Sequence, residues 1–375
     1  MATKLKDYFP IIRERESILA EIKKSNILQS KFDSWDDTMQ KEFLDLCSGV
    51  KGLKLLYDGF FKEVMNPEYV PDRLNDFLSS MLRQEIKILK VLPADSVRIS
   101  DESSLLVMDI VIELEDGSIA NLEIQKIGYL FPGQRSACYS ADLLLRQYRR
   151  VRNEATAANA NGLAQKTKFN YRNIKSVYTI VLFEKSPKEF NDFPDDYYHF
   201  FEQKADTGLK LELLQKYLFI PLDIFRKNKH NRDINEKRDA WLTLFSSDDP
   251  DDIIELIEKY PEFRKIYEEG YQICLNTEGV MDMFSEELYE LDKNTVEYMI
   301  DEMQETVDKQ KQIISERDYT ISELQDTIRQ MKKSQEQTVR GAVMILRNLK
   351  IPEPEIITQI CDQYQLSEKE VRDYL

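Results

Sequence analysis

The clearest alternation of apolar and polar side chains in the chain runs from Leu105 to Lys126. Every even-numbered residue from 106 to 114 is apolar, and so is every even-numbered residue from 120 to 124. Alternation with a period of two is typical of strands that have one face in the core. The two runs are separated by Glu115-Asp116-Gly117, which is suited to a turn. The stretch therefore predicts a β-hairpin of two half-buried strands.

The length of the hairpin loop follows from the requirement that both even-numbered sets face one core. A two-residue loop would place even positions of one strand beside odd positions of the other. A three-residue loop with Gly117 in the left-handed conformation, a common hairpin connection, restores the match. Asp109 is then expected directly opposite Glu123, with Gln125 two residues further along the same face. Lys126 is expected to point to the other face.

Two opposed carboxylates favour a bound cation. Directly opposed side chains in a hairpin have Cβ atoms about 4.5–5.5 Å apart, so Asp109 and Glu123 would repel each other without a cation between them. The chain has two histidines without a partner at metal-ligand spacing, and its four cysteines form no CxxC pair. These counts argue against a zinc site, an HNH nuclease and a Ser-His-Asp enzyme. The metal that carboxylates select is Mg²⁺ or Mn²⁺.

The remaining pattern predicts helices before the hairpin and a mixture of strands and helices after it. Between residues 10 and 92 the apolar residues are spaced largely as in helices, and the pattern becomes that of an extended segment before Pro93. Residues 240–270 return to a helical pattern, with a cap at Ser247 to Pro250. Further strands are expected at residues 176–183, 191–202 and 211–225, the last stopped or bent by Pro221.

A basic segment follows the hairpin. The whole chain has a net charge of −16, yet eight basic residues between 146 and 175 accompany a single acid, Glu154. Surfaces that bind phosphate need concentrated positive charge, although runs of Lys and Arg are also common on solvated faces. Residues 152–168 are rich in Ala, Asn and Thr with little apolar patterning, and we expect a mobile loop there.

Residues 286–340 contain no Gly or Pro and carry a heptad pattern. β-Branched residues recur every seven positions from Ile300 to Ile328, and Met303, Gln310, Arg317, Leu324 and Met331 lie midway between them. This pattern favours a parallel two-stranded coiled coil, in which Gln310 and Arg317 weaken the pairing and set its register. We expect a homodimer through residues 296–331. The alternative is one long helix folded back on the body of the protein.

Neither a membrane span nor a secretory signal is expected. The chain has no window of about 18 uncharged apolar residues, the length that a bilayer requires. Its first 16 residues, MATKLKDYFPIIRERE, are charged throughout and lack the apolar stretch of a signal peptide. We therefore expect a cytoplasmic protein.

The order of hairpin residues, Asp109, a turn and then Glu123-x-Gln125, resembles the active-site hairpin of the PD-(D/E)xK nuclease superfamily. Residues 107–126 are similar to the branch of PD-(D/E)xK family transposases and recombination-promoting nucleases, in which Gln commonly replaces the motif lysine. Two flanking segments share the likeness. DGFFKEVM, from Asp58, resembles the family's Asp-x-x-Phe-Lys helix, and QRSACYSADLLLRQY, from Gln134, resembles its helix that carries Arg and Tyr.

This resemblance implies a fold and a division of the chain. The implied fold class is α/β, with a mixed sheet flanked by helices, a helical N-terminal part, a coiled-coil helix and a small helical tail. The expected domains are residues 1–285 for the nuclease-like domain, 286–340 for the coiled coil and 341–375 for the tail.

The implied activity is that of a divalent-metal-dependent DNA endonuclease associated with recombination or mobile elements. Its expected catalytic residues are Asp109, Glu123 and Gln125, and its expected metal ligands are Asp109, Glu123, the backbone carbonyl of Ile124 and, as a further candidate, Asp58. The residues expected to contact nucleic acid are Gln134, Arg135, Arg146, Arg149, Arg150, Arg152, Lys166 and Lys168. Gln125 departs from the broad motif, because an amide carries no charge and cannot act as a base. We therefore expect slower cleavage than in a relative with lysine there.

Two other functions stay open at this point. The missing motif lysine permits a DNA-binding relative with weak or absent cleavage. A coiled-coil interaction protein with merely solvated hairpin acids is the other alternative. The nuclease is favoured, because an interaction protein has no need to place Asp109, Asn121, Glu123 and Gln125 on one face beside a basic helix.

Overall fold

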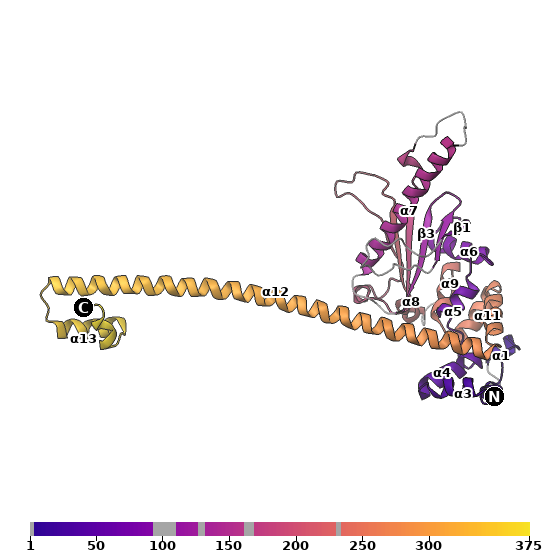
Figure 1. Cartoon of the computed structure of the whole chain (residues 1–375), viewed down its shortest axis with the longest axis horizontal. Helices are drawn as coiled ribbons and strands as arrows, with labels where there is room; N and C mark the ends of the chain where they lie inside the picture. Colours follow the sequence, from indigo (N-terminus) through magenta and orange to yellow (C-terminus); the bar gives the residue numbers. More distant parts are fainter. Residues whose placement is uncertain (1–3, 93–109, 127–131, 161–168, 230–233) are drawn as a thin grey trace. The chain divides into compact units, whose positions relative to one another are not determined.

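The computed structural model describes residues 4–92, 110–126, 132–160, 169–229 and 234–375. It divides into two compact units, residues 1–300 and residues 301–375. The first unit contains a mixed six-stranded sheet flanked by helices, which confirms the predicted fold class (Figure 1). None of the helices in the described part of the chain combines the length and the apolar character that crossing a bilayer requires.

The sheet has the strand order β1-β2-β3-β4-β6-β5. Strands β3, β4 and β6 run parallel to one another, β2 pairs antiparallel with β1 and β3, and β5 pairs antiparallel with β6 at the edge. The carboxyl ends of the three parallel strands therefore meet at one edge of the sheet. The strands are β1 (Ile88–Leu92), β2 (Ile110–Leu114), β3 (Ile119–Gln125), β4 (Val177–Phe183), β5 (His199–Phe201) and β6 (Gln215–Pro221).

The hairpin formed by β2 and β3 has the predicted register. Ile110 pairs with Leu122 and Ile112 pairs with Ala120, so even positions oppose even positions. Gly117 has a φ of 84°, and its N–H donates to the carbonyl of Leu114 at 2.9 Å. The three-residue loop with a left-handed glycine is confirmed. Asp109, the residue predicted to lie opposite Glu123, is outside the described residues.

The even-numbered face of the hairpin packs into the main core, as the alternation predicted. It belongs to a core cluster that includes apolar side chains of helices before and after the sheet in the chain. Figure 1 shows several of these helices beside the sheet. These helices include α4 (Asp37–Cys47), α5 (Asp58–Val64), α6 (Pro71–Leu82), α9 (Lys237–Ser246) and α11 (Glu262–Ile273). The remaining helices of the first unit are α1 (Lys4–Tyr8), α2 (Arg15–Ile22), α3 (Asn26–Asp33), α8 (Leu222–Lys229), α10 (Pro250–Lys259) and the beginning of α12 (Thr277–Asn348).

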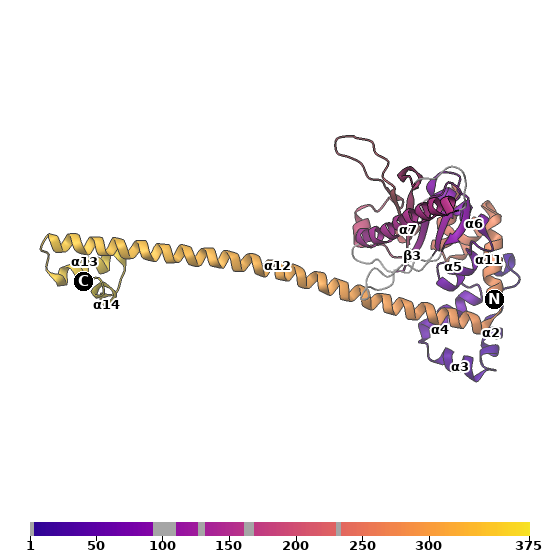
Figure 2. The ribbon, with the colours of Figure 1, turned by 45° about the horizontal axis from the view of Figure 1, so that its top comes forward.

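The odd-numbered face of the hairpin is also covered, so the prediction of half-buried strands was wrong. Every residue of β2 and β3 is buried. Helix α7 (Pro132–Ala160) lies across this face of the sheet, where its Tyr139 and Leu143 pack against Val111, Ile119 and Val177 (Figure 2). The alternation identified the face toward the main core, but it gave no sign that a second layer covers the polar face.

Helix α7 includes part of the segment that was expected to be a mobile loop. Residues 152–160 continue the helix to Ala160. Alanine is the strongest helix former, and no Gly or Pro occurs between Gly133 and Gly162 to end the helix. The expectation was therefore wrong for residues 152–160. The rest of the expected loop, residues 161–168, is outside the described residues.

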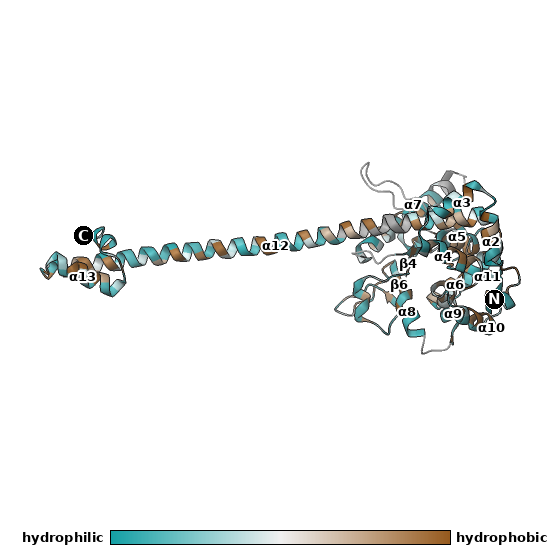
Figure 3. Ribbon diagram, turned by 90° about the horizontal axis from the view of Figure 1, so that it is seen from below, coloured by the Kyte–Doolittle hydropathy of each residue, from teal (hydrophilic) through white to brown (hydrophobic). Residues whose placement is uncertain are grey.

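The second unit contains the end of α12 with α13 (Glu353–Tyr364) and α14 (Glu368–Arg372). Its small core consists of Val339, Val343, Ile356, Ile357, Ile360 and Val371. Ser367 and Glu370 form the predicted capping box at the start of α14. The heptad residues along α12 are exposed in the single chain, for example Ile314 at 58%. Figure 3 shows hydrophobic bands among hydrophilic ones along this helix.

Candidate active site

A row of polar side chains follows the odd-numbered face of β3. It consists of Asn121, Glu123 and Gln125, and α7 lies over the same face. Across the parallel ladder Asn121 pairs with Thr179 of β4, while Glu123 pairs with Val181. Strand alternation thus gathers two predicted site residues, Glu123 and Gln125, with Asn121 and Thr179 in the middle of the sheet.

The polar row is almost closed to solvent, with an exposed fraction of 8% for Glu123, 3% for Gln125 and 0% for Asn121. Both side-chain amides, of Asn121 and Gln125, and the hydroxyl of Thr179 have no hydrogen-bond partner among the described residues. Each such buried group costs about 1–3 kcal/mol of stability. Uncompensated buried polar groups in a native protein point to a bound water, ion or ligand.

The chemistry of this row fits a hard divalent cation. The carboxylate of Glu123 and the amide oxygens of Asn121 and Gln125 are of the type that Mg²⁺ and Mn²⁺ prefer. Within the described ranges no three His, Cys, Asp or Glu side chains come close enough together to hold a metal ion. The second carboxylate expected at the site, that of Asp109, is outside those ranges. A metal between Asp109 and Glu123 therefore stays a prediction.

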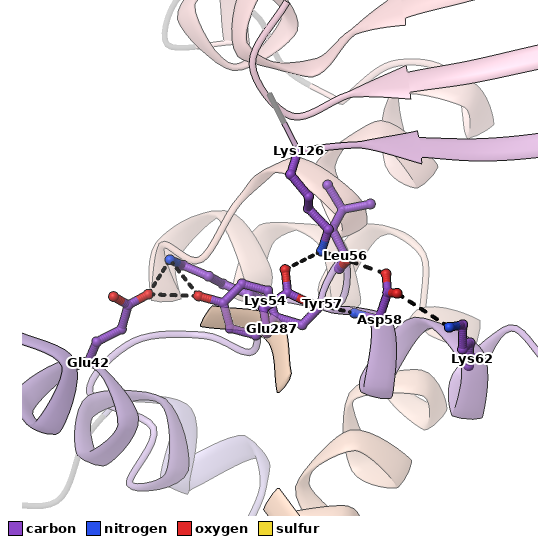
Figure 4. A network of polar contacts seen from close by, with 8 residues as sticks. All are labelled: Glu42, Lys54, Leu56, Tyr57, Asp58, Lys62, Lys126 and Glu287. Atoms are coloured by element: carbon purple, nitrogen blue, oxygen red, sulfur yellow. Dashed lines mark hydrogen bonds and ion pairs between the residues drawn. The ribbon is translucent and has the colours of Figure 1, made fainter. Parts of the chain in front are cut away.

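The structure places Asp58 in a network of ion pairs at the end of β3 (Figure 4). Lys126, the residue after β3, donates to Oε1 of Glu287 and to the carbonyl of Leu56, both at 2.5 Å. Its Nζ is 4.0 Å from Oδ1 of Asp58, whose other oxygen is 3.3 Å from Lys62. The predicted orientation of Lys126, away from the face of Glu123, is confirmed. In the structure the carboxylate of Asp58 therefore lies beside two lysines. Its role as a metal ligand stays a prediction.

Glu287 connects three elements through this network. It lies on α12, it accepts the Asp58 N–H at the start of α5 at 3.0 Å, and it binds Lys126 at the end of β3. Lys126 and Glu287 are each 7% exposed. This pair was not predicted from the sequence. The available signal was Lys126 itself, a cation at a strand position that alternation assigns to the core, because a buried charge requires a partner.

A second group of contacts holds the segment before α5. Lys54 donates to Glu42, and the hydroxyl of Tyr57 donates to the same carboxylate oxygen at 2.9 Å. Burial raises the pKa of Tyr57 far above its usual range, and the charge of Glu42 raises it further. Burial alone would raise the pKa of Glu42, but the contacts with Lys54 and Tyr57 outweigh it and lower that pKa. Tyr57 also places its ring 5.3 Å from the ammonium of Lys126, so both groups of contacts meet at this residue.

Replacing Glu42 with Gln is expected to destabilise the protein in a pH-dependent way. The pKa of Glu42 is lower in the folded state than its usual value of 4.5, so its contribution is present above pH 4.5 and is lost as the pH falls through the lower folded pKa. Because Glu42 is only half-buried, we expect a difference of about 0.5–1 kcal/mol at neutral pH. Urea denaturation of both proteins at neutral and acidic pH measures it. A difference that stays constant on acidification would contradict this reading.

The basic residues of α7 have different roles in the structure. Arg146 pairs with Asp142 at 2.7 Å, while Arg150 pairs with Glu113 and donates to the Gly117 carbonyl at 2.8 Å. Arg146 thus forms an ion pair within α7, and Arg150 connects α7 to the hairpin. Of the other residues expected to contact nucleic acid, Gln134, Arg149 and Arg152 are exposed, and Arg135 is partly buried. Lys166 and Lys168 are outside the described residues.

Comparison with known proteins agrees with this architecture. Residues 55–302 match the family model described as PD-(D/E)XK nuclease family transposase. No curated protein and no solved structure gives a significant match. The matched range begins three residues before Asp58, contains the hairpin and α7, and includes Glu287. It therefore covers the polar row and the contacts of Lys126, but not Glu42 or Lys54. The chain belongs to the PD-(D/E)XK nuclease family transposases.

Proposed function

We propose that the chain is a divalent-metal-dependent DNA endonuclease of the cytoplasm that acts in recombination or on mobile elements. Family membership supports a nuclease of this kind. The single observation that carries the proposal is the buried polar row of β3, in which Glu123 lies between two amide side chains without partners among the described residues. A solvated acidic patch would not need to hold these groups inside the fold.

In this proposal Asp109, Glu123 and the backbone carbonyl of Ile124 hold Mg²⁺ or Mn²⁺. When bound, such an ion supplies a nucleophilic water and relieves the negative charge on the phosphoryl oxygens. Gln125 orients the water by hydrogen bonding and takes no proton, because an amide is not a base. We assign Asp58 a structural role, since it is committed to Lys126 and Lys62.

DNA is the proposed partner, and α7 provides the proposed contact surface. Arg149 and Arg152 are exposed on this helix, and Gln134 lies exposed in its first turn. Arg135, Lys166 and Lys168 stay in the proposal as further DNA contacts, and we leave out Arg146 and Arg150 because they are engaged in internal ion pairs. Binding through such a surface weakens steeply as the salt concentration rises.

A plasmid-nicking assay with Mg²⁺ or Mn²⁺ tests the proposal, with a chelator as the control. We expect nicking that requires the added metal. DNA binding that weakens with salt but without nicking would favour a weakly active or inactive relative instead. If the protein neither binds nor cleaves DNA, an interaction protein is the remaining function.

We also propose that α12 forms the parallel homodimer through residues 296–331. The heptad positions Ile300, Val307, Ile314, Ile321 and Ile328 are between 42% and 58% exposed in the single chain. These residues form a regular apolar stripe on a charged helix. A second copy of the same helix would bury this stripe in a coiled coil.

Replacing Ile314 and Ile321 together with Glu is expected to convert a dimer into a monomer. Two charged pairs would then face each other in the seam between the helices. Analytical ultracentrifugation measures the change in mass. The matched control is Tyr319→Glu, which adds the same charge at an exposed position outside the seam and should leave the dimer intact. A wild-type chain that sediments as a monomer at all concentrations would contradict the proposed dimer.

A further inference from the structure

We propose that an aromatic pocket at the edge of the sheet receives an unstacked base of the DNA substrate. This inference rests on the proposed nuclease function and adds to it a class of substrate. The pocket has a volume of about 350 Å³, within the range of about 300–1,000 Å³ that is typical of small-molecule sites. It is lined by Gly133, Phe201, Glu202, Gln203, Tyr217 and Phe219.

The pocket opens on the same face of the sheet as the candidate active site. Phe219 lies in the same transverse row as Glu123, because Glu123 pairs with Val181 and Val181 pairs with Phe219. Two steps between neighbouring strands correspond to about 10 Å. Gly133, in the first turn of α7, forms another side of the pocket, and α7 covers the polar row. The pocket therefore lies close to the candidate active site on one face of the sheet.

The rings that line the pocket are arranged to accept a flat ligand. Phe201 is 47% exposed, and its ring centroid is 5.2 Å from that of Phe219. The ring of Tyr217, the cross-strand partner of Phe201, lies 6.3 Å from that of Phe219. Aromatic side chains of this kind stack with any nucleobase, since every base has a π face.

The polar residues of the pocket favour a base over a phosphate or a second protein copy. The residues that line the pocket include no Lys or Arg to bind a phosphate, whereas the amide of Gln203 is a group that pairs with base edges. A second copy adding a strand at this edge is disfavoured, because β5 has only three residues for backbone pairing. Because a base must leave its stack to enter, we infer a preference for single-stranded or locally unpaired DNA.

Two neighbouring phenylalanines provide a matched test. Phe201 pairs with Tyr217 and faces the pocket, whereas the adjacent Phe200 pairs with Leu218 and is 39% exposed on the opposite face. We compare Phe201→Ala with Phe200→Ala by fluorescence anisotropy. The probes are labelled oligothymidylate and an abasic strand of the same length. Loss of one stacked base is expected to weaken binding of oligothymidylate by about 5- to 100-fold in Phe201→Ala. Phe200→Ala and Phe201→Tyr should bind as the wild type does.

The abasic strand separates base binding from backbone binding. We expect the wild type to prefer oligothymidylate and Phe201→Ala to bind both strands equally weakly. A second variant, Gly133→Leu, leaves every ring in place. A Cβ at position 133 meets no atom within 4 Å, so there is room for a side chain to begin there, and a leucine that occupies the pocket should cause the same loss.

The outcomes distinguish failure of the pocket from failure of the proposed function. If the wild type binds and cleaves DNA but Phe201→Ala and Gly133→Leu behave as Phe200→Ala does, the pocket does not bind a base and only this inference fails. A change of mass in sedimentation caused by Phe201→Ala would identify a second copy as the occupant and would also overturn it. If the wild type neither binds nor cleaves DNA, the proposed function fails and the pocket inference fails with it.

Discussion

Glu123→Gln is expected to reduce metal-dependent DNA cleavage by about a hundredfold or more, because it removes a charged ligand from the proposed metal site. Glutamine has nearly the same shape as glutamate, so the packing beneath α7 is retained and only the charge is lost. The exposed fraction of Glu123 is 8%, so water replaces little of the lost electrostatic interaction. The rate of plasmid nicking with Mg²⁺ measures the effect, and Asp109→Asn is expected to give a similar loss.

The matched control for this prediction is Glu115→Gln. Glu115 lies in the loop of the same hairpin but is exposed, so the same substitution should leave cleavage unchanged. Isothermal calorimetry with Mg²⁺ gives a second measurement, since Glu123→Gln should lose the heat of binding that the wild type shows. If Glu123→Gln cleaves DNA at the rate of the wild type, this carboxylate is not a metal ligand and the proposed mechanism loses its main support.

The sequence was sufficient to predict the hairpin because several independent constraints agree there. The apolar even-numbered positions, the loop length and the conformation of Gly117 require one register, and the structure has it. The buried strand β4 and the end of β6 at Pro221 were also predicted, since continuous β-branched runs and a proline are local signals. Asn121, Glu123 and Gln125 share a face for the same local reason.

Other features depended on contacts between distant residues and could not be predicted. Arg150 was expected to bind DNA, but it pairs with Glu113 across a separation of 37 residues. Lys126 and Glu287 are separated by 161 residues, and periodicity within either segment does not identify the other. The covering of the polar face by α7 is likewise a tertiary arrangement. The error at residues 152–160 has another cause, because an Ala-rich segment without apolar patterning still has high helix propensity.

The Lys126–Glu287 ion pair provides the largest expected effect on stability. Both side chains are buried, so removing one partner leaves an uncompensated charge inside the protein. Lys126→Met is expected to lower the free energy of unfolding by about 3–5 kcal/mol, a large part of the about 5–15 kcal/mol that stabilises a typical domain. Urea denaturation followed by tryptophan fluorescence measures the loss in the first unit, because Trp35 and Trp241 are the two tryptophans of the chain and both lie in that unit.

The double variant Lys126→Met/Glu287→Gln distinguishes an ion pair from simple packing. Glutamine has no charge but still accepts the Asp58 N–H that Glu287 binds at 3.0 Å, so the double variant should regain much of the stability lost in Lys126→Met. Lys62→Met is the control within the same network. Lys62 is 61% exposed beside Asp58, so its loss should cost about 0.5 kcal/mol or less. If the double variant is less stable than Lys126→Met by the full cost of Glu287→Gln alone, the two charges are not coupled. The end of β3 would then be held by packing and not by its ion pair with α12.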